Sequence, residues 1–104
     1  MSSTTKGPSS APSPTDKSWT FLTNHGHVLI YISKNQTARV RDVADVIGIT
    51  ERTAQGILND LETAGYIEKI REGRRNRYVI HPEMNFRHPQ ESTQRVIELI
   101  KLFR

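Results

Sequence analysis

The sequence predicts a mainly α-helical domain with a small β-hairpin, an α+β fold, and two observations carry this prediction. Residues 40–61 contain two runs of apolar residues at helical spacing, separated by a Gly-Ile-Thr turn. Two short stretches rich in β-branched and aromatic residues, 66–71 and 77–81, flank a loop that contains glycine and arginine. The 104 residues leave room for one modest domain with a small core.

Composition indicates an intracellular protein. The chain has no cysteine, so neither disulfides nor thiolate metal sites can form. No apolar run approaches the roughly 20 residues that a membrane span needs, and the N-terminus lacks the apolar core of a secretory signal. We therefore expect a cytoplasmic location, associated with the nucleoid if the source is prokaryotic, and no membrane partner.

Positive charge is concentrated in one segment, residues 69–77. The formal net charge of the chain is +4. The segment holds five basic residues and one acidic residue, so its own net charge is also +4; they are Lys69, Arg71, Arg74, Arg75 and Arg77 against Glu72. A basic segment of this density favours an anionic partner.

The N-terminal part divides into a tail and a first helix. Residues 1–17 are rich in Ser, Thr and Pro and nearly free of large apolar residues, which predicts a disordered tail. Ser18 is expected to cap a helix of about four turns that starts at Trp19. Its apolar residues at helical spacing are Phe21, Leu22, Val28, Leu29 and Ile32.

Residues 40–61 are the stretch around which the chain is organised. The first helix has Val40, Val43, Ala44 and Ile47 on one stripe, and the second has Ala54, Ile57, Leu58 and Leu61. Gly48 can adopt the left-handed conformation that ends a helix, and Thr50 can cap the next one. Two helices joined by so tight a turn form a helix-turn-helix, and Gly65 is expected to end the second of them.

A hairpin, a connector and a last helix complete the chain. The hairpin is expected to have a loop over residues 72–76, followed by a connector in which Met84 and Phe86 pack on the core. Residues 90–104 are predicted to be helical. Six of the eight residues at 96–103 are apolar, more than one buried face requires. This excess predicts burial on two sides, with a second subunit as the cover.

The order of these elements resembles the winged helix-turn-helix transcription regulators of the MarR-like and ArsR-like kind. The phrases that carry the resemblance are DVADVIGITERTAQGILNDLETAGYI at 42–67 and REGRRNRYVI at 71–80. The resemblance implies a winged helix-turn-helix DNA-binding domain over 18–89 and a C-terminal dimerisation helix over 90–104. It also implies a homodimer that binds palindromic double-stranded DNA and regulates transcription, commonly as a repressor.

The outer face of the second motif helix supplies the predicted base-reading residues: Thr50, Glu51, Arg52, Thr53, Gln55, Gly56 and Asn59. A helix fits the major groove, where an arginine can contact guanine and an amide side chain can contact adenine through two hydrogen bonds. The two threonines lie at the helix N-terminus and suit phosphate. Gly56 lets the helix approach the DNA closely, and Glu51 has the alternatives of accepting from cytosine or orienting Arg52.

The hairpin supplies the predicted wing residues: Arg71, Arg74, Arg75, Asn76 and Arg77. Their guanidinium groups suit phosphates or a minor groove. For Arg77 the alternative is an ion pair with Glu68 or Glu72. Before the motif, Arg39 and Arg41 either flank the groove on phosphates or pair with Asp42 and Asp45, and the sequence leaves both choices open.

The predicted dimer interface consists of Trp19, Leu22, Val96, Leu99, Ile100 and Phe103. Two rival functions stay open: a winged-helix module that docks an acidic protein, and a histidine-based metal sensor. His25 and His27 point to different sides of a helix, and no helical His-x-x-x-His pair occurs, which disfavours a metal site. No catalytic motif is present, so we expect no enzyme activity and no cofactor. The sequence identifies no small-molecule effector.

Overall fold

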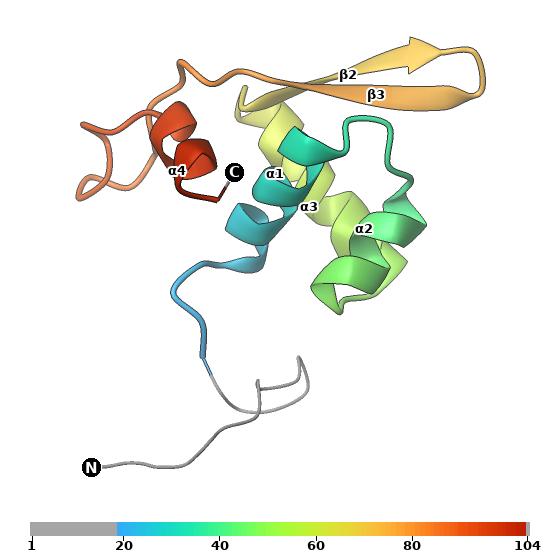
Figure 1. Ribbon diagram of the computed structural model, residues 1–104, viewed down its shortest axis with the longest axis horizontal. Helices are drawn as coiled ribbons and strands as arrows, with labels where there is room; N and C mark the ends of the chain where they lie inside the picture. The colour runs from blue at the N-terminus through green and yellow to red at the C-terminus, as the bar shows by residue number, and fades with distance from the viewer. Residues whose placement is uncertain (1–18, 104) are drawn as a thin grey trace.

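A computed structural model of the protein describes residues 19–103 (Figure 1). The predicted tail at 1–17 lies outside the described residues. The elements follow in the order α1 (Asn24–Lys34), α2 (Val40–Ile47), α3 (Glu51–Thr63), β2 (Ile67–Glu72), β3 (Arg75–Ile80) and α4 (Val96–Leu102). The predicted α+β fold, with a helix-turn-helix, a hairpin and a C-terminal helix, is confirmed. None of the described helices is long and apolar enough to cross a membrane.

The turn between α2 and α3 has the predicted chemistry. Gly48 has a φ of 84°, and its N–H donates to the Ala44 carbonyl oxygen at 2.8 Å. The Thr50 side chain accepts a hydrogen bond from the Thr53 N–H and so caps α3. At the other end of α3, Gly65 has a φ of 88°. Since L side chains rarely adopt this conformation, glycine is what allows both helices to end where they do.

The core lies where α1 contacts the other three helices, and Figure 1 shows α1 between α4 and the α2–α3 pair. Its largest fully buried side chains come from all four helices: Ile32, Leu58, Val28, Val43 and Val96. The stripes predicted for α2 and α3 supply Val43, Ala44, Ala54, Ile57, Leu58 and Leu61. Helical spacing therefore identified the core face of the helix-turn-helix.

The predicted start of the first helix was wrong. α1 begins at Asn24, and the hydroxyl of Thr23 accepts a hydrogen bond from the Gly26 N–H at 3.2 Å. Thr23 satisfies a free amide of the first turn, which is the role that was expected of Ser18. Trp19 and Phe21 precede the helix and remain exposed, with their rings in an edge-to-face contact at 5.0 Å.

The turn of the hairpin is tighter than predicted. β2 and β3 pair antiparallel from Ile67↔Ile80 to Glu72↔Arg75, so only Gly73 and Arg74 remain for the turn. Arg75 and Asn76, expected in the loop, belong to β3. The positive φ of 63° at Gly73 permits so short a connection. In Figure 1 the hairpin projects along one side of the helices.

The last helix also starts later than predicted, at Val96 rather than near residue 90. The residues before it are held instead by backbone hydrogen bonds to the connector: Phe86 N–H to Gln94 O at 3.1 Å and Val96 N–H to Met84 O at 2.8 Å. Because these amides and carbonyls are used across the connector, the helix begins only after them. Met84 and Phe86 pack against the core, as expected.

Candidate nucleic-acid interface

The outer face of α3 is open to solvent within the described part of the chain. Its stripe opposite the core holds Glu51, Arg52, Thr53, Gly56 and Asn59, all exposed, and Gln55, which is half-buried. Neither Glu51 nor Arg52 forms a side-chain hydrogen bond or ion pair with another residue of 19–103. Both side chains are therefore free to meet a partner.

The two threonines at the start of α3 have different local roles. The Thr50 hydroxyl accepts from the Thr53 N–H at 3.0 Å and donates to the Thr53 hydroxyl oxygen at 2.9 Å. Thr50 thus uses its hydroxyl inside the cap. The Thr53 hydroxyl accepts from Thr50 and keeps its own proton for an outside acceptor. Of the pair, Thr53 is the one equipped to donate to a phosphate.

Two amide side chains are joined one turn apart on the same face. Gln55 Nε2 donates to Asn59 Oδ1 at 3.0 Å. The contact leaves Gln55 Oε1 as a free acceptor and Asn59 Nδ2 as a free donor. An acceptor and a donor side by side are the complement of the adenine edge in the major groove.

Gly56 has no internal reason to be glycine. A methyl group built at this position meets no atom of residues 19–103 within 4 Å, and the residue lies in the interior of a 13-residue helix. An exposed glycine inside a helix costs about 1 kcal/mol relative to alanine. The open space in front of it is available to a closely approaching partner.

The arginines of the hairpin have unlike surroundings. Arg77 Nε lies 3.1 Å from Glu72 Oε2, which is the alternative that the sequence had left open. Arg71 Nε donates to Gly73 O at 2.9 Å, and Arg75 donates to Thr37 O at 3.0 Å. Arg74, exposed in the turn, forms no side-chain hydrogen bond or ion pair within residues 19–103.

Arg39 and Arg41 lie at the start of α2 and are exposed. The backbone N–H of Arg39 donates to Asp42 Oδ2 at 3.1 Å, so Asp42 serves the helix N-terminus. Among the described residues neither arginine side chain pairs with Asp42 or Asp45. Both guanidinium groups are available to phosphates that flank a groove.

Three of the four histidines contact carboxylates or backbone. His25 Nε2 lies 2.8 Å from Asp60 Oδ2, and His81 lies 3.6 Å from Glu68 and 3.9 Å from Glu83. His88 Nδ1 accepts from the Gln90 N–H at 3.1 Å. Within 19–103 no three His, Asp or Glu side chains gather closely enough to hold a metal ion.

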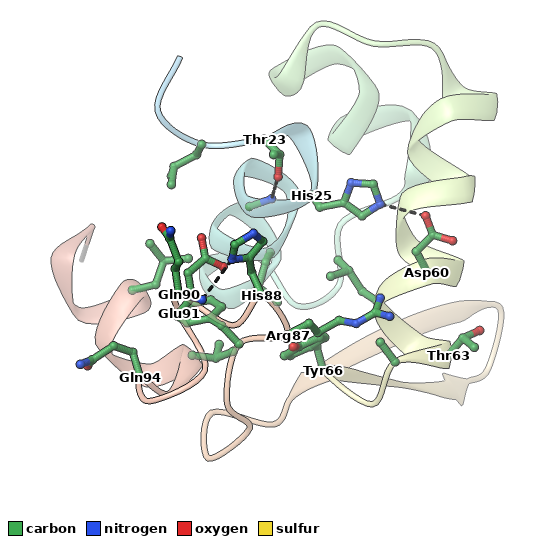
Figure 2. A pocket seen from close by; sticks show the side chains of 18 of the residues that line it. Thr23, His25, Asp60, Thr63, Tyr66, Arg87, His88, Gln90, Glu91 and Gln94 are labelled. Carbon is green, nitrogen blue, oxygen red and sulfur yellow. Dashed lines mark hydrogen bonds and ion pairs between the residues drawn. The ribbon is translucent and has the colours of Figure 1, made fainter. Parts of the chain in front are cut away.

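A cavity of about 1020 Å³ lies between α1, the C-terminal half of α3, the connector and α4. Figure 2 shows His25 and Asp60 joined on one side of it and Glu91 and His88 on the other. Its apolar lining includes Leu22, Leu29 and Leu99. Residues 86–94 form one wall, and the sequence did not predict this wall because a helix was expected from residue 90.

The predicted dimer residues separate into three groups, of which one, Leu22 and Leu99, is half-buried and lines the cavity. Val96 and Ile100 are buried in the chain's own core, so their side chains are already covered. Trp19 and Phe103 are exposed by 75% and 44%. Two further apolar side chains that were not predicted to be exposed, Phe21 and Leu102, are exposed by 92% and 77%.

A helix-turn-helix with a polar, uncovered second helix, followed by an arginine-rich antiparallel hairpin, defines a winged helix-turn-helix protein. The sequence profile of the MarR family matches residues 20–77, more than half of the chain. The chain therefore belongs to the MarR family. We call residues 67–80, the two strands and their turn, the wing.

Solved structures of one MarR-like regulator share this fold. MepR, a transcription regulator of the Staphylococcus aureus multidrug efflux pump MepA, is 20% identical with a TM-score of 0.52, over 77% of this chain and 53% of MepR. A MepR mutant from a multidrug-resistant S. aureus clinical isolate gives the same identity and TM-score over 77% of this chain and 52% of its own. This chain thus spans about half the length of MepR. No curated protein matches it.

Proposed function

We propose that the protein acts as a homodimer that binds a palindromic DNA operator and represses transcription by occluding it. The observation that carries the proposal is the outer face of α3, which is polar and uncovered within residues 19–103 and has a glycine facing open space. Glycine at this position brings no advantage to a helix that faces only solvent. In a helix that lies in the major groove, it allows the backbone to approach the DNA more closely.

The proposed contacts follow from the free donors and acceptors. Arg52 contacts guanine, and the joined amides of Gln55 and Asn59 contact adenine; each such contact discriminates by roughly 1–3 kcal/mol. Thr53 donates to a phosphate at the N-terminus of α3, with Thr50 and Glu51 beside it. Wing arginines contact the backbone or the minor groove.

The homodimer is proposed from the exposed apolar side chains on one part of the molecule. Trp19, Phe21, Leu102 and Phe103 belong to the segment before α1 and to the end of α4. In Figure 1 both lie on the α4 side of α1, away from α2. A two-fold pairing through them must place the two α3 helices about 34–36 Å apart to enter successive major grooves.

The proposed regulatory role is supported by family membership and by the fold shared with MepR, a transcription regulator of an efflux pump. Repression requires only that the bound dimer exclude other proteins from a promoter.

Selection of bound duplexes from a random pool tests the proposal. A palindromic motif with half-sites one helical turn apart is the expected result. Affinity for the selected duplex should fall steeply as salt rises, because each phosphate contact releases counterions. If Arg74→Ala combined with Arg75→Ala leaves both the affinity and its salt dependence unchanged, the wing does not contact DNA. Binding to an acidic protein with no duplex selected would favour the interaction module instead.

A further inference from the structure

Arg75 is tied to the loop that precedes α2. Its guanidinium NH1 donates to the backbone oxygen of Thr37 at 3.0 Å. Further along the same strand, the Tyr78 N–H donates to Gln36 O at 2.9 Å. Figure 1 shows this loop alongside β3. One backbone bond and one side-chain bond therefore fasten β3 to residues 36–37.

The Arg75 contact is the one nearest the tip. The wing buries Ile67 and Tyr78 near its base, whereas 71–75 are all exposed. A two-stranded hairpin alone is marginally stable in water. Without a contact close to the turn, the outer half of the wing has only its own ladder of hydrogen bonds to hold its direction.

Arg74 differs from its neighbours. Arg71 donates to Gly73 O and Arg77 pairs with Glu72, so both help to shape the hairpin itself. Arg74 occupies the turn with its guanidinium unengaged within residues 19–103. A free guanidinium presents five N–H donors in a fork that matches two phosphate oxygens.

We propose that Arg75 is a positioning residue that holds the wing against the 36–37 loop, and that Arg74 is the wing arginine that contacts DNA phosphate. The inference rests on the proposed function and divides the wing between its two adjacent arginines. An arginine that donates to Thr37 O must give up or share that bond to bind a phosphate, and Arg74 has no such competing bond within residues 19–103.

Salt-dependent binding of the full chain to the selected duplex tests the division. Arg74→Ala should lower the slope of log affinity against log salt by about 0.9 for each bound wing. Arg75→Ala should weaken binding in the wild-type background. In the Arg74→Ala background, adding Arg75→Ala should change neither the affinity nor the slope. Arg75 is proposed to affect binding only by positioning Arg74, so its effect disappears once the Arg74 contact is removed.

Arg95→Ala, just before α4, provides the matched charge control, since it removes one exposed arginine away from both the wing and the proposed dimer interface. A change no larger than this control counts as no change. A second fall in slope when Arg75→Ala is added to Arg74→Ala would show that Arg75 itself contacts phosphate, and the proposal would be overturned.

Amide hydrogen exchange without DNA provides an independent test. Arg75→Ala should accelerate exchange of the Tyr78 amide, which lies beside the lost contact, while Arg74→Ala should leave it at the wild-type rate. If the Tyr78 amide exchanges at the same rate in all three proteins, Arg75 does not hold the wing against the 36–37 loop. A wild-type protein that binds no duplex would contradict the proposed function itself, whereas binding that weakens additively would contradict only the division between the two arginines.

Discussion

Gln55 and Asn59 are joined by a hydrogen bond of 3.0 Å on the uncovered face of α3. Because the bond uses the Gln55 amide nitrogen and the Asn59 amide oxygen, it fixes which atom of each side chain faces outward. Pairs of this kind stabilise a helix by only about 0.2–0.5 kcal/mol. Their larger consequence is to hold a donor and an acceptor in one orientation before any partner arrives.

Asn59→Ala should therefore change DNA specificity with little effect on stability. The variant loses the donor proposed to read adenine, so preference at one position of each half-site should relax by about 1–3 kcal/mol. Thermal unfolding should be nearly unchanged. Selection from a random duplex pool, compared with the wild type, measures the first effect. A motif with every position retained would exclude Asn59 from base reading.

Gly56→Ala should stabilise the fold and weaken DNA binding. The added methyl group meets no atom of the described residues within 4 Å, so the gain in helix propensity, about 1 kcal/mol, should appear in full. The same methyl group lies where the DNA is proposed to approach. Denaturant unfolding and duplex affinity measure the two effects separately.

Gly26→Ala is the matched control for this change. It makes the same substitution in α1, where the new methyl group meets Leu22 Cβ at 3.4 Å, an ordinary contact. Duplex affinity should stay at the wild-type value in this variant. If Gly56→Ala also kept its affinity, close approach at Gly56 could not be the reason for the glycine.

The helix-turn-helix was predictable because its determinants are local. Apolar spacing fixed the buried stripes of α2 and α3, and Gly48 and Thr50 fixed the turn between them. These residues act through neighbours within one or two helical turns. The polar face of α3 followed as the side opposite the stripe.

The ends of the first and last helices depend on partners distant in sequence and so were misplaced. Apolar residues at 19–22 continue the helical spacing of α1, but Thr23 caps the helix and leaves Phe21 exposed. Similarly, the start of α4 is set by bonds between residues near 85 and 95. Single-sequence periodicity does not contain such pairings. The roles of the wing arginines were hidden for the same reason, since Thr37 lies 38 positions before Arg75.

Substitution of Thr50 should mainly lower the stability of the fold, whereas substitution of Thr53 should mainly lower the affinity for DNA. Thr50→Ala removes the side-chain cap of α3 and should destabilise the fold by about 1 kcal/mol. Thr53→Ala leaves that cap bond in place, because the Thr53 N–H is retained, and should lower duplex affinity with a smaller effect on stability. Unfolding curves together with salt-dependent binding separate the two. Equal losses of stability in both variants would contradict the assignment.

Stability should decline at alkaline pH because of two tyrosines. Burial raises the pKa of both Tyr66 and Tyr78 above the ordinary value of 10.0. Below about pH 10 both states hold the proton and this contribution to the free energy of unfolding is constant. Above it the unfolded chain releases protons that the folded chain retains, so stability falls as pH rises.

Tyr66→Phe tests both the loss of stability at alkaline pH and the contribution of the hydrogen bond between Tyr66 and the connector. The Tyr66 hydroxyl donates to Asn85 O at 2.9 Å, and its loss should cost about 1 kcal/mol at neutral pH. The decline above pH 10 should become shallower, since one of the two shifted groups is gone. A wild-type and a variant with the same pH profile would exclude Tyr66 as a contributor.

The apolar surface at the end of α4 should control assembly. Leu102→Glu places a charge on a side chain that is exposed in the single chain and proposed to be covered in the dimer. The folded protomer should tolerate this change, but the dimer should dissociate, because an unpaired charge is costly to bury. Sedimentation measures the mass, and operator affinity should fall far more than the loss of one contact explains, since two linked half-sites become independent.

Val46→Glu is the matched control because Val46 is the other large apolar side chain of a described helix that is strongly exposed, by 60%, and it lies on α2. It adds the same charge to a similar environment outside the proposed interface, so the sedimenting mass should equal that of the wild type. If the two variants have the same sedimenting mass, the end of α4 is not the interface. The next residues to test are Trp19 and Phe21, because changing both to serine leaves α1 and its Thr23 cap intact.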